Sequence, residues 1–450
     1  MNNNTHRDMI LHENMWKVMV RLSWPAVIAM VLYGLNTIFD AVFIGRFVGE
    51  TALAGISMAY PLSQISLGLG SLAGVGAGSA LSIAIGSSDH YTQKRIIGNM
   101  NYLSVLFAAA LTIIALILCK PLVAMMGATG ESLVQGTDYF RVTLYGSVLW
   151  ISGLAGNMVV RAEGKMGFAA VMMGIGLLVN IAANYLLIVI LDYGVKGAAW
   201  GTNLGMFIYT FLFFLYAKSR HISFEAKAFS IHRDPHIIKA ILSNGIPSFI
   251  MTFMTLIQGI VVLNALGRYG STTDIAFYGI VYRIFIFMLT PIFGLMRALQ
   301  PAVGINFGAR KYERVISNVK IFTVAGLVLM LPLWLVMLVN PQAILHIMLP
   351  SAEFIHTDLW NFRIFIMLLP VLPVMFMAMT FFPAIDEGNK ASVIGIIRQI
   401  VFYIPVMLTL PRFFGVRWVY IGSFLIDLIM IAWAIVIILI QFKKLRILKR

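Results

Sequence analysis

Twelve long apolar runs constrain the fold of this chain more than any other feature of its sequence. As a helix rising about 1.5 Å per residue, each run is long enough to cross a hydrocarbon core about 30 Å thick. The chain is 60% hydrophobic and only 11% charged, whereas soluble domains carry about 25% charged residues. The sequence therefore predicts an all-α membrane protein with twelve transmembrane helices. Gly, Pro and charged residues bound the runs, which cover roughly 16–44, 52–85, 96–119, 133–160, 167–191, 197–217, 238–266, 274–307, 316–339, 357–384, 391–411 and 418–441.

Basic residues are distributed unequally between the two sides that such helices define. Alternate crossings put 22 Lys and Arg residues on the side of both termini and the central loop, and 6 on the other side. The positive-inside rule then predicts cytoplasmic termini. The excess of 33 basic over 18 acidic residues follows from this orientation and from contact with anionic lipid in the bilayer. No basic stripe interleaved with aromatic residues indicates a nucleic-acid partner.

A repeat at a spacing of about 222 residues divides the chain into two halves of six runs each. Six is an even number, so both halves insert the same way round, and such parallel repeats normally enclose a central cavity. We therefore expect a six-helix lobe over 1–217, a cytoplasmic linker over 218–239 and a pseudo-symmetric six-helix lobe over 240–450. The matched positions are Pro25 with Pro247, Gly45-Arg46 with Gly267-Arg268, and Gly86 with Gly308.

The first apolar run carries a single ionisable residue, Asp40. On a helix it lies roughly 9 Å from Arg46, where the run ends, and therefore inside the membrane. A charge there costs about 2.5 to 3.5 kcal/mol unless it faces a cavity and has a function. The repeat breaks at this point, because Asp40 aligns with Val262. A proton carrier is the favoured interpretation of Asp40, and a structural buried acid is the alternative.

Amide side chains accompany this carboxylate. Asn36 lies one turn before Asp40, and Asn180 and Asn184 share one face of the fifth run. Amides can hydrogen-bond either protonation state of a carboxyl group without adding charge. A role in which Asn180 and Asn184 only join two helices stays open.

In the second half, Arg283 and Asp427 fall at similar depth. We expect them to form an ion pair, either lining a cavity or only holding two helices together. Arg297, Arg363 and Arg398 are expected to snorkel or to bind lipid headgroups. Methionines such as Met288 and Met296 are candidates for the adaptable wall of a binding cavity, with ordinary packing as the alternative.

Motifs of enzymes are missing from the sequence. It has no nucleophile elbow, no zinc-protease motif and no phosphate-binding loop for ATP, and we expect no catalytic residues, metal or cofactor. Its one cysteine, Cys119, excludes an intramolecular disulfide.

Several segments in a fixed order resemble the multidrug and toxic compound extrusion (MATE) family, in particular its DinF- and MepA-like bacterial branch. The resemblance covers nearly the whole chain and implies two lobes in a V shape. It also implies a monomer in the bacterial inner membrane that exports small-molecule cationic drugs in exchange for protons or sodium. The segments are IFDAVFIGR, TALAGISMAYP, RAEGKMGFAAVMMGIGLLVNIAANYLLI, IAFYGIVYRIF, LQPAVGINFGARKYERV and AIDEGNKASVIGIIRQI.

The same resemblance suggests further site residues. The family places a tyrosine and a threonine near the first-helix carboxylate, and Tyr139 and Thr202 occupy the matching positions. Asn184 stands where members commonly have a second acid, and Gln258 is the nearest counterpart of the NorM-type glutamate. These departures favour protons as the coupling ion. The alternative is sodium, held by Asp40 and amide oxygens.

Two other functions stay open at this point. Related families include lipid-linked sugar flippases, which usually line the cavity with several basic residues to hold phosphates. Outside transport, the alternative is a receptor or scaffold.

Overall fold

The computed structural model describes residues 5–219, 222–348 and 353–448, and these ranges are helical with no strand. The first half contains α1 Thr5–His12, α2 Met15–Phe47, α3 Glu50–Ser87, α4 His90–Ile117, α5 Cys119–Met125, α6 Gly130–Tyr145, α7 Ser147–Ala162, α8 Met166–Asn184, the π-helix η1 Tyr185–Ile190 and α9 Gly194–Lys218. The second half contains α10 Pro235–Tyr269, α11 Thr272–Gly308, α12 Tyr312–Val339, α13 Pro341–Met348, α14 His356–Ile366, α15 Leu372–Ala384, α16 Gly388–Ile396, the π-helix η2 Ile397–Tyr403, α17 Ile404–Phe414 and α18 Arg417–Ile447.

Ten helices in the described ranges are long and apolar enough to cross a membrane, or eleven if the bent pair α6 and α7 is one span. Two of the twelve predicted spans are therefore not continuous helices. The span 133–160 bends by 56° between α6 and α7, at Gly146, where the side chain of Asn203 fills the place of a Cβ. The span 357–384 is divided by a turn over 367–371, which contains Pro370 and is followed by Pro373 in the first turn of α15, and each proline lacks a backbone donor.

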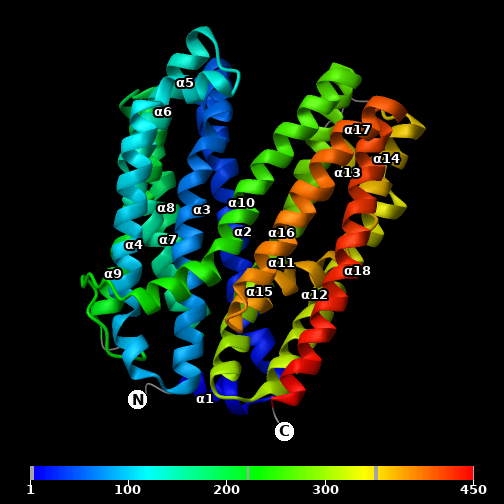
Figure 1. The fold of residues 1–450 in the computed structure, drawn as a ribbon. Coiled ribbons are helices and arrows are strands. Elements are labelled where there is room, and N and C mark those ends of the chain that lie inside the picture. Colours follow the sequence, from blue (N-terminus) through cyan, green and yellow to red (C-terminus); the bar gives the residue numbers. More distant parts are fainter. Residues whose placement is uncertain (1–4, 220–221, 349–352, 449–450) are drawn as a thin grey trace.

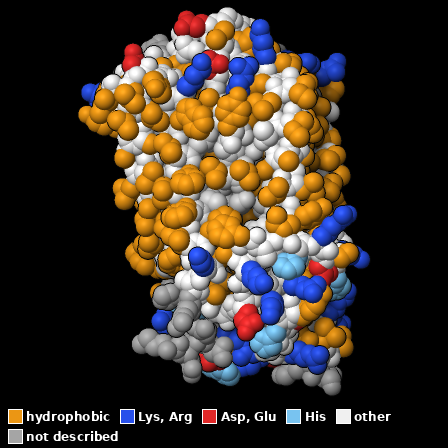
Figure 2. Space-filling model, turned by 90° about the vertical axis from the view of Figure 1, so that its left-hand side faces the viewer, with side chains coloured by type: hydrophobic (Ala, Val, Ile, Leu, Met, Phe, Trp, Pro, Cys, Tyr) orange, Lys and Arg blue, Asp and Glu red, His pale blue; other side chains and the backbone are white. Residues whose placement is uncertain are grey.

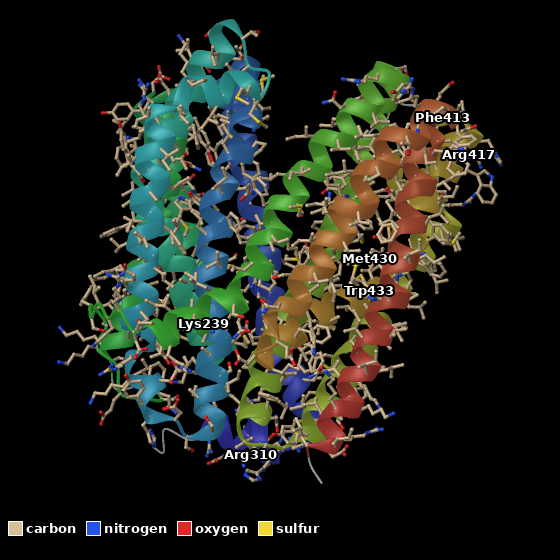
Figure 3. The ribbon with its side chains drawn as sticks, viewed as in Figure 1. Lys239, Arg310, Phe413, Arg417, Met430 and Trp433 are labelled. Carbon is tan, nitrogen blue, oxygen red and sulfur yellow. The ribbon has the colours of Figure 1, made fainter. Side chains whose placement is uncertain are left out.

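Two groups of helices diverge from a shared lower end, which carries both termini (Figure 1). The long helix α10 starts beside the lower half of the first group, where Lys239 lies, and rises into the second group (Figure 3). In the same figure Arg310 lies at the lower end, whereas Phe413 and Arg417 lie at the upper end of the second group. The N-terminal helix α1 is held at the lower end by Arg314, which donates to the backbone carbonyls of Ile10 at 2.9 Å and Glu13 at 2.8 Å.

The two halves meet mainly where α3 packs on α10 and α2 packs on α11. The helices α3 and α11 also cross closely at the lower end. A Cβ on Gly86 would collide with the carbonyl oxygen of Ile305, and a Cβ on Gly308 would collide with that of Ile83. Gly86 and Gly308, the two glycines of this reciprocal contact, are matched positions of the sequence repeat. The matched glycines therefore mark where the two halves approach each other about the pseudo-symmetry axis.

On the face shown in Figure 2, a hydrophobic belt lies between two ends that carry the charged side chains. Many large apolar side chains are exposed, among them Ile117 at 75% and Leu439 at 58% exposure. Helices satisfy their own backbone hydrogen bonds, so an apolar belt of this kind is stable in hydrocarbon. The predicted all-α membrane class is confirmed.

Candidate functional site

Four of the predicted coupling residues meet in one hydrogen-bonded chain inside the first half. Asn184 Nδ2 donates to Asp40 Oδ1 at 2.7 Å and to Asn180 Oδ1 at 3.4 Å. Asn180 Nδ2 in turn donates to Thr202 Oγ1 at 3.3 Å. The three neutral side chains are buried, with 0% exposure for Asn184, 3% for Asn180 and 7% for Thr202. The helices α2, α8 and α9 thus place a carboxylate at the end of a chain of amide and hydroxyl groups.

Two glycines of α9 make room for these amides. A Cβ on Gly201 would collide with Asn184 Oδ1, and a Cβ on Gly205 would press on the side chain of Asn180. Gly201 and Gly205 are four residues apart and therefore lie on one helix face. Sequence reasoning missed them, although their spacing matches that of Asn180 and Asn184.

A π-helical turn follows the site directly. η1 begins at Tyr185, the residue after Asn184. Such turns are rare and occur frequently at functional sites, because the extra residue in the turn rotates the side chains that follow it. No periodicity in the sequence indicated this turn.

Tyr139 and Asn36 complete the set predicted for this site. Tyr139 in α6 is 8% exposed and lies close enough to Asp40 for an electrostatic interaction with its carboxylate. The side chain of Asn36 lies outside the described residues, so its predicted part in the site stays a prediction.

A small cavity borders the network at Asn180 and Thr202, and neither Asp40 nor Asn184 lines it. Its volume is about 60 Å³, and Tyr33, Asn180, Thr202 and Tyr209 contribute polar groups to its wall. A water needs at least about 10 to 15 Å³ of such space and two or more polar partners. The cavity can therefore hold a few waters beside Asn180 and Thr202, and it is too small for a drug.

The second half contains a buried ion pair that the sequence analysis assigned wrongly. Asp427 pairs with Arg398, not with Arg283: its Oδ1 accepts from Arg398 Nη2 at 2.9 Å and from Arg398 Nε at 3.1 Å. Arg398 Nη1 also donates to Gln258 Oε1 at 3.4 Å. Arg283 is exposed. The expectation that Arg398 snorkels is also wrong, because its guanidinium turns inward from η2 to α18 and α10.

Other candidates of the second half lie in packed surroundings. Arg297 points inward, with Nη1 at 3.6 Å from Met158 Sδ in α7, and not toward a lipid headgroup. Met296 is 9% exposed and belongs to the hydrophobic core, and Met288 packs against that core. For both methionines, packing accounts for the position.

The repeated helical halves, the apolar belt and the intramembrane acid network define a multi-pass membrane protein built like a secondary transporter. The MatE family model matches residues 25–186 and 247–409, once in each half. The chain belongs to the MatE family.

Similar proteins extend this assignment. The chain is 26% identical over 414 residues to the multidrug export protein MepA of Staphylococcus haemolyticus, covering 90% of this chain and 89% of that protein. It is also 26% identical over 419 residues to MepA of Staphylococcus aureus strain MRSA252, with the same coverage. A crystal structure of MATE in the bent conformation shares the fold with a TM-score of 0.91 at 22% identity, over 98% of each chain. An outward-facing multidrug resistance MATE transporter of the MOP superfamily gives 0.90 at 23% identity, over 97% of this chain and 98% of that chain.

Proposed function

We propose that this protein is a multidrug exporter of the bacterial inner membrane, with both termini cytoplasmic, which exchanges bulky organic cations for protons at Asp40. One observation carries the proposal: the hydrogen bond from Asn184 to Asp40 inside a buried network of neutral groups. The name of the MepA relatives, multidrug export protein, supports the export of drugs.

The amide of Asn184 suits a carboxylate that gains and loses a proton. While Asp40 is ionised, it accepts from Asn184 Nδ2. Asn184 Oδ1 is buried and accepts no hydrogen bond from the described residues. Once protonated, Asp40 has an O–H to donate, and rotation of the Asn184 amide presents that oxygen to it. One neighbour therefore serves both protonation states.

Export follows from the difference between these two states. An ionised Asp40 attracts a cationic drug, and a proton arriving from the outer side removes that attraction and releases the drug. Loss of the proton to the inner side restores the negative charge. The differential affinity that alternating access requires thus comes from one carboxylate.

Sodium is the second candidate ion. Asp40 and the oxygens of Asn180 and Asn184 are hard ligands of the kind that sodium and other hard cations prefer. The unpartnered Asn184 Oδ1 favours this alternative as well. The alternative function, a flippase for an anionic lipid-linked sugar, has less support, because the charge of Arg398 is already compensated by Asp427.

Ethidium efflux from cells that express the chain tests the proposal. We expect efflux with the wild type and background efflux with Asp40→Asn, which mimics the protonated carboxyl. The matched control is Asp192→Asn, since Asp192 is an exposed acid outside the hydrogen-bonded network of Asp40, and its positive φ of 51° suits asparagine. No efflux of any cation by the wild type, with normal membrane expression, contradicts the proposal.

A further inference from the structure

A second cavity lies at the lower end of the first half, among α1, α2, α8 and α9. Its volume is about 740 Å³, which is large enough for a molecule far bigger than water. It shares no lining residue with the cavity beside Asn180 and Thr202. The site described above therefore does not account for it.

One side of this cavity is basic. His6, Arg21 and Lys165 line it, and they come from α1, α2 and the turn before α8. The charge of Lys165 is compensated by Glu163, whose carboxylate accepts from Lys165 Nζ at 2.9 Å. Glu163 is 2% exposed, and it also accepts from Tyr216 Oη at 2.9 Å and from the Ser223 amide at 2.8 Å.

The charge of Arg21 is left without such compensation, and the imidazole of His6 faces the same cavity. Arg21 is exposed and forms none of the ion pairs found in the described part of the chain. Burial, together with the positive charges of Lys165 and Arg21, lowers the pKa of His6. The negative charge of Glu163 raises this pKa, but by less than the other causes lower it. The field at His6 is therefore positive, and an anion placed between Arg21 and His6 gains from it.

Apart from Tyr216 and Ser219, the rest of the wall is apolar, and it is open to the side of the molecule. Leu22, Pro25 and Leu212 line it together with Phe168 and Leu215, of which the last two are 38% and 49% exposed. The basic residues match the anionic headgroup of a lipid, and the apolar trough matches its acyl chain.

Exposed tryptophans place this cavity at the membrane surface. In α2, Trp16 is 49% and Trp24 is 68% exposed, and they lie on either side of Arg21 in the chain. Indole rings prefer the level of the headgroups, with the polar N–H near water and the ring toward hydrocarbon. The basic side of the cavity thus lies where lipid phosphates lie.

We propose that this cavity binds one phospholipid with an anionic headgroup, its phosphate between Arg21 and His6 and one acyl chain along Leu22, Leu212 and Leu215. A cationic drug is repelled by the charge of Arg21. Free phosphate gains nothing from the apolar trough. Anionic lipid matches both the charge and the trough.

Native mass spectrometry of the full chain in detergent tests this site. The protein is titrated with phosphatidylglycerol, with phosphatidylcholine of the same acyl chains, and with inorganic phosphate. We expect one tightly held phosphatidylglycerol, weaker phosphatidylcholine and no retained phosphate. Arg21→Gln is expected to weaken phosphatidylglycerol binding about fivefold, or about 1 kcal/mol, while Arg21→Lys keeps most of it.

Two more variants separate charge from space. Gly167 lines the cavity, and a Cβ there meets nothing within 4 Å. Gly167→Leu therefore fills part of the cavity and is expected to weaken the binding of both lipids. Lys17→Gln is the matched control: it removes a positive charge from the same end of α2, at a residue that does not line the cavity and whose ion pair with Glu13 is exposed. Equal binding of both lipids, equal effects of Arg21→Gln and Lys17→Gln, or binding of phosphate as tight as that of phosphatidylglycerol overturns the proposal.

Discussion

Removing one partner of the Arg398–Asp427 pair should destabilise the second half strongly. Replacing Arg398 by methionine keeps a long side chain but leaves the carboxylate of Asp427, which is 9% exposed, without its cation. Loss of one partner of a buried pair costs about 3 to 5 kcal/mol. The side chains of Arg398 and Asp427 are 21% and 13% exposed, so water relieves part of this, and we expect about 3 kcal/mol.

The double variant Arg398→Met with Asp427→Leu should recover most of that loss, because no uncompensated charge stays buried. Replacing a whole buried pair by apolar residues is often neutral or stabilising. The coupling free energy from the double-mutant cycle should therefore be large, at least about 2 kcal/mol.

Denaturant unfolding in detergent, monitored by tryptophan fluorescence, measures the loss of stability in each variant and hence the coupling free energy. Trp418 and Trp433 lie in α18 together with Asp427 and report on the second half. Lys17→Met is the control, since its exposed ion pair with Glu13 should contribute less than about 1 kcal/mol. A loss in Arg398→Met no larger than in Lys17→Met, or a double variant that loses the sum of both single losses, refutes the reasoning.

Three further predictions concern the site, the contact between the halves and the topology. Asn184→Ala should lower ethidium efflux about tenfold or more at normal expression, because a hydrogen bond to a charged group contributes about 1.5 to 3 kcal/mol; unchanged efflux contradicts the role of the amide. Gly76→Val should reduce thermal stability by about 1 to 3 kcal/mol or more, since a Cβ there collides with the backbone of Ile241; Gly34→Ala, with nothing within 4 Å, should not. Cysteine at the exposed position 227, in a chain otherwise free of cysteine, should react with impermeant thiol reagents from the cytoplasm only, and labelling from outside contradicts the orientation.

The first-half network was predictable from the sequence because two separate signals agree there. Helical periodicity places Asn180 and Asn184 on one face of the fifth run, and family resemblance adds Thr202. Asp40 was conspicuous because a lone charge in hydrocarbon is costly. The repeat was equally informative, since the matched Gly86 and Gly308 form a reciprocal contact between the halves.

The partner of Asp427 was not predictable in this way. Counting residues from a helix end gives the depth of a side chain in the membrane, but not which neighbouring helix it faces. Arg283 satisfied the estimate of depth and yet is exposed. Arg398 lies in the π-helix η2, whose extra residue per turn changes the direction of its side chains relative to an α-helix. Assigning the pair required the packing of α18 against the segment that contains η2.

The measurement that tests the central claim most directly is drug transport by purified protein in liposomes under imposed ion gradients. A pH gradient without sodium should drive transport of an organic cation by the wild type and by Asp192→Asn, whereas Asp40→Asn should give only background transport. A sodium gradient at equal pH should have no effect. Full pH-driven transport by Asp40→Asn, or transport by the wild type that depends on sodium alone, contradicts proton exchange at Asp40.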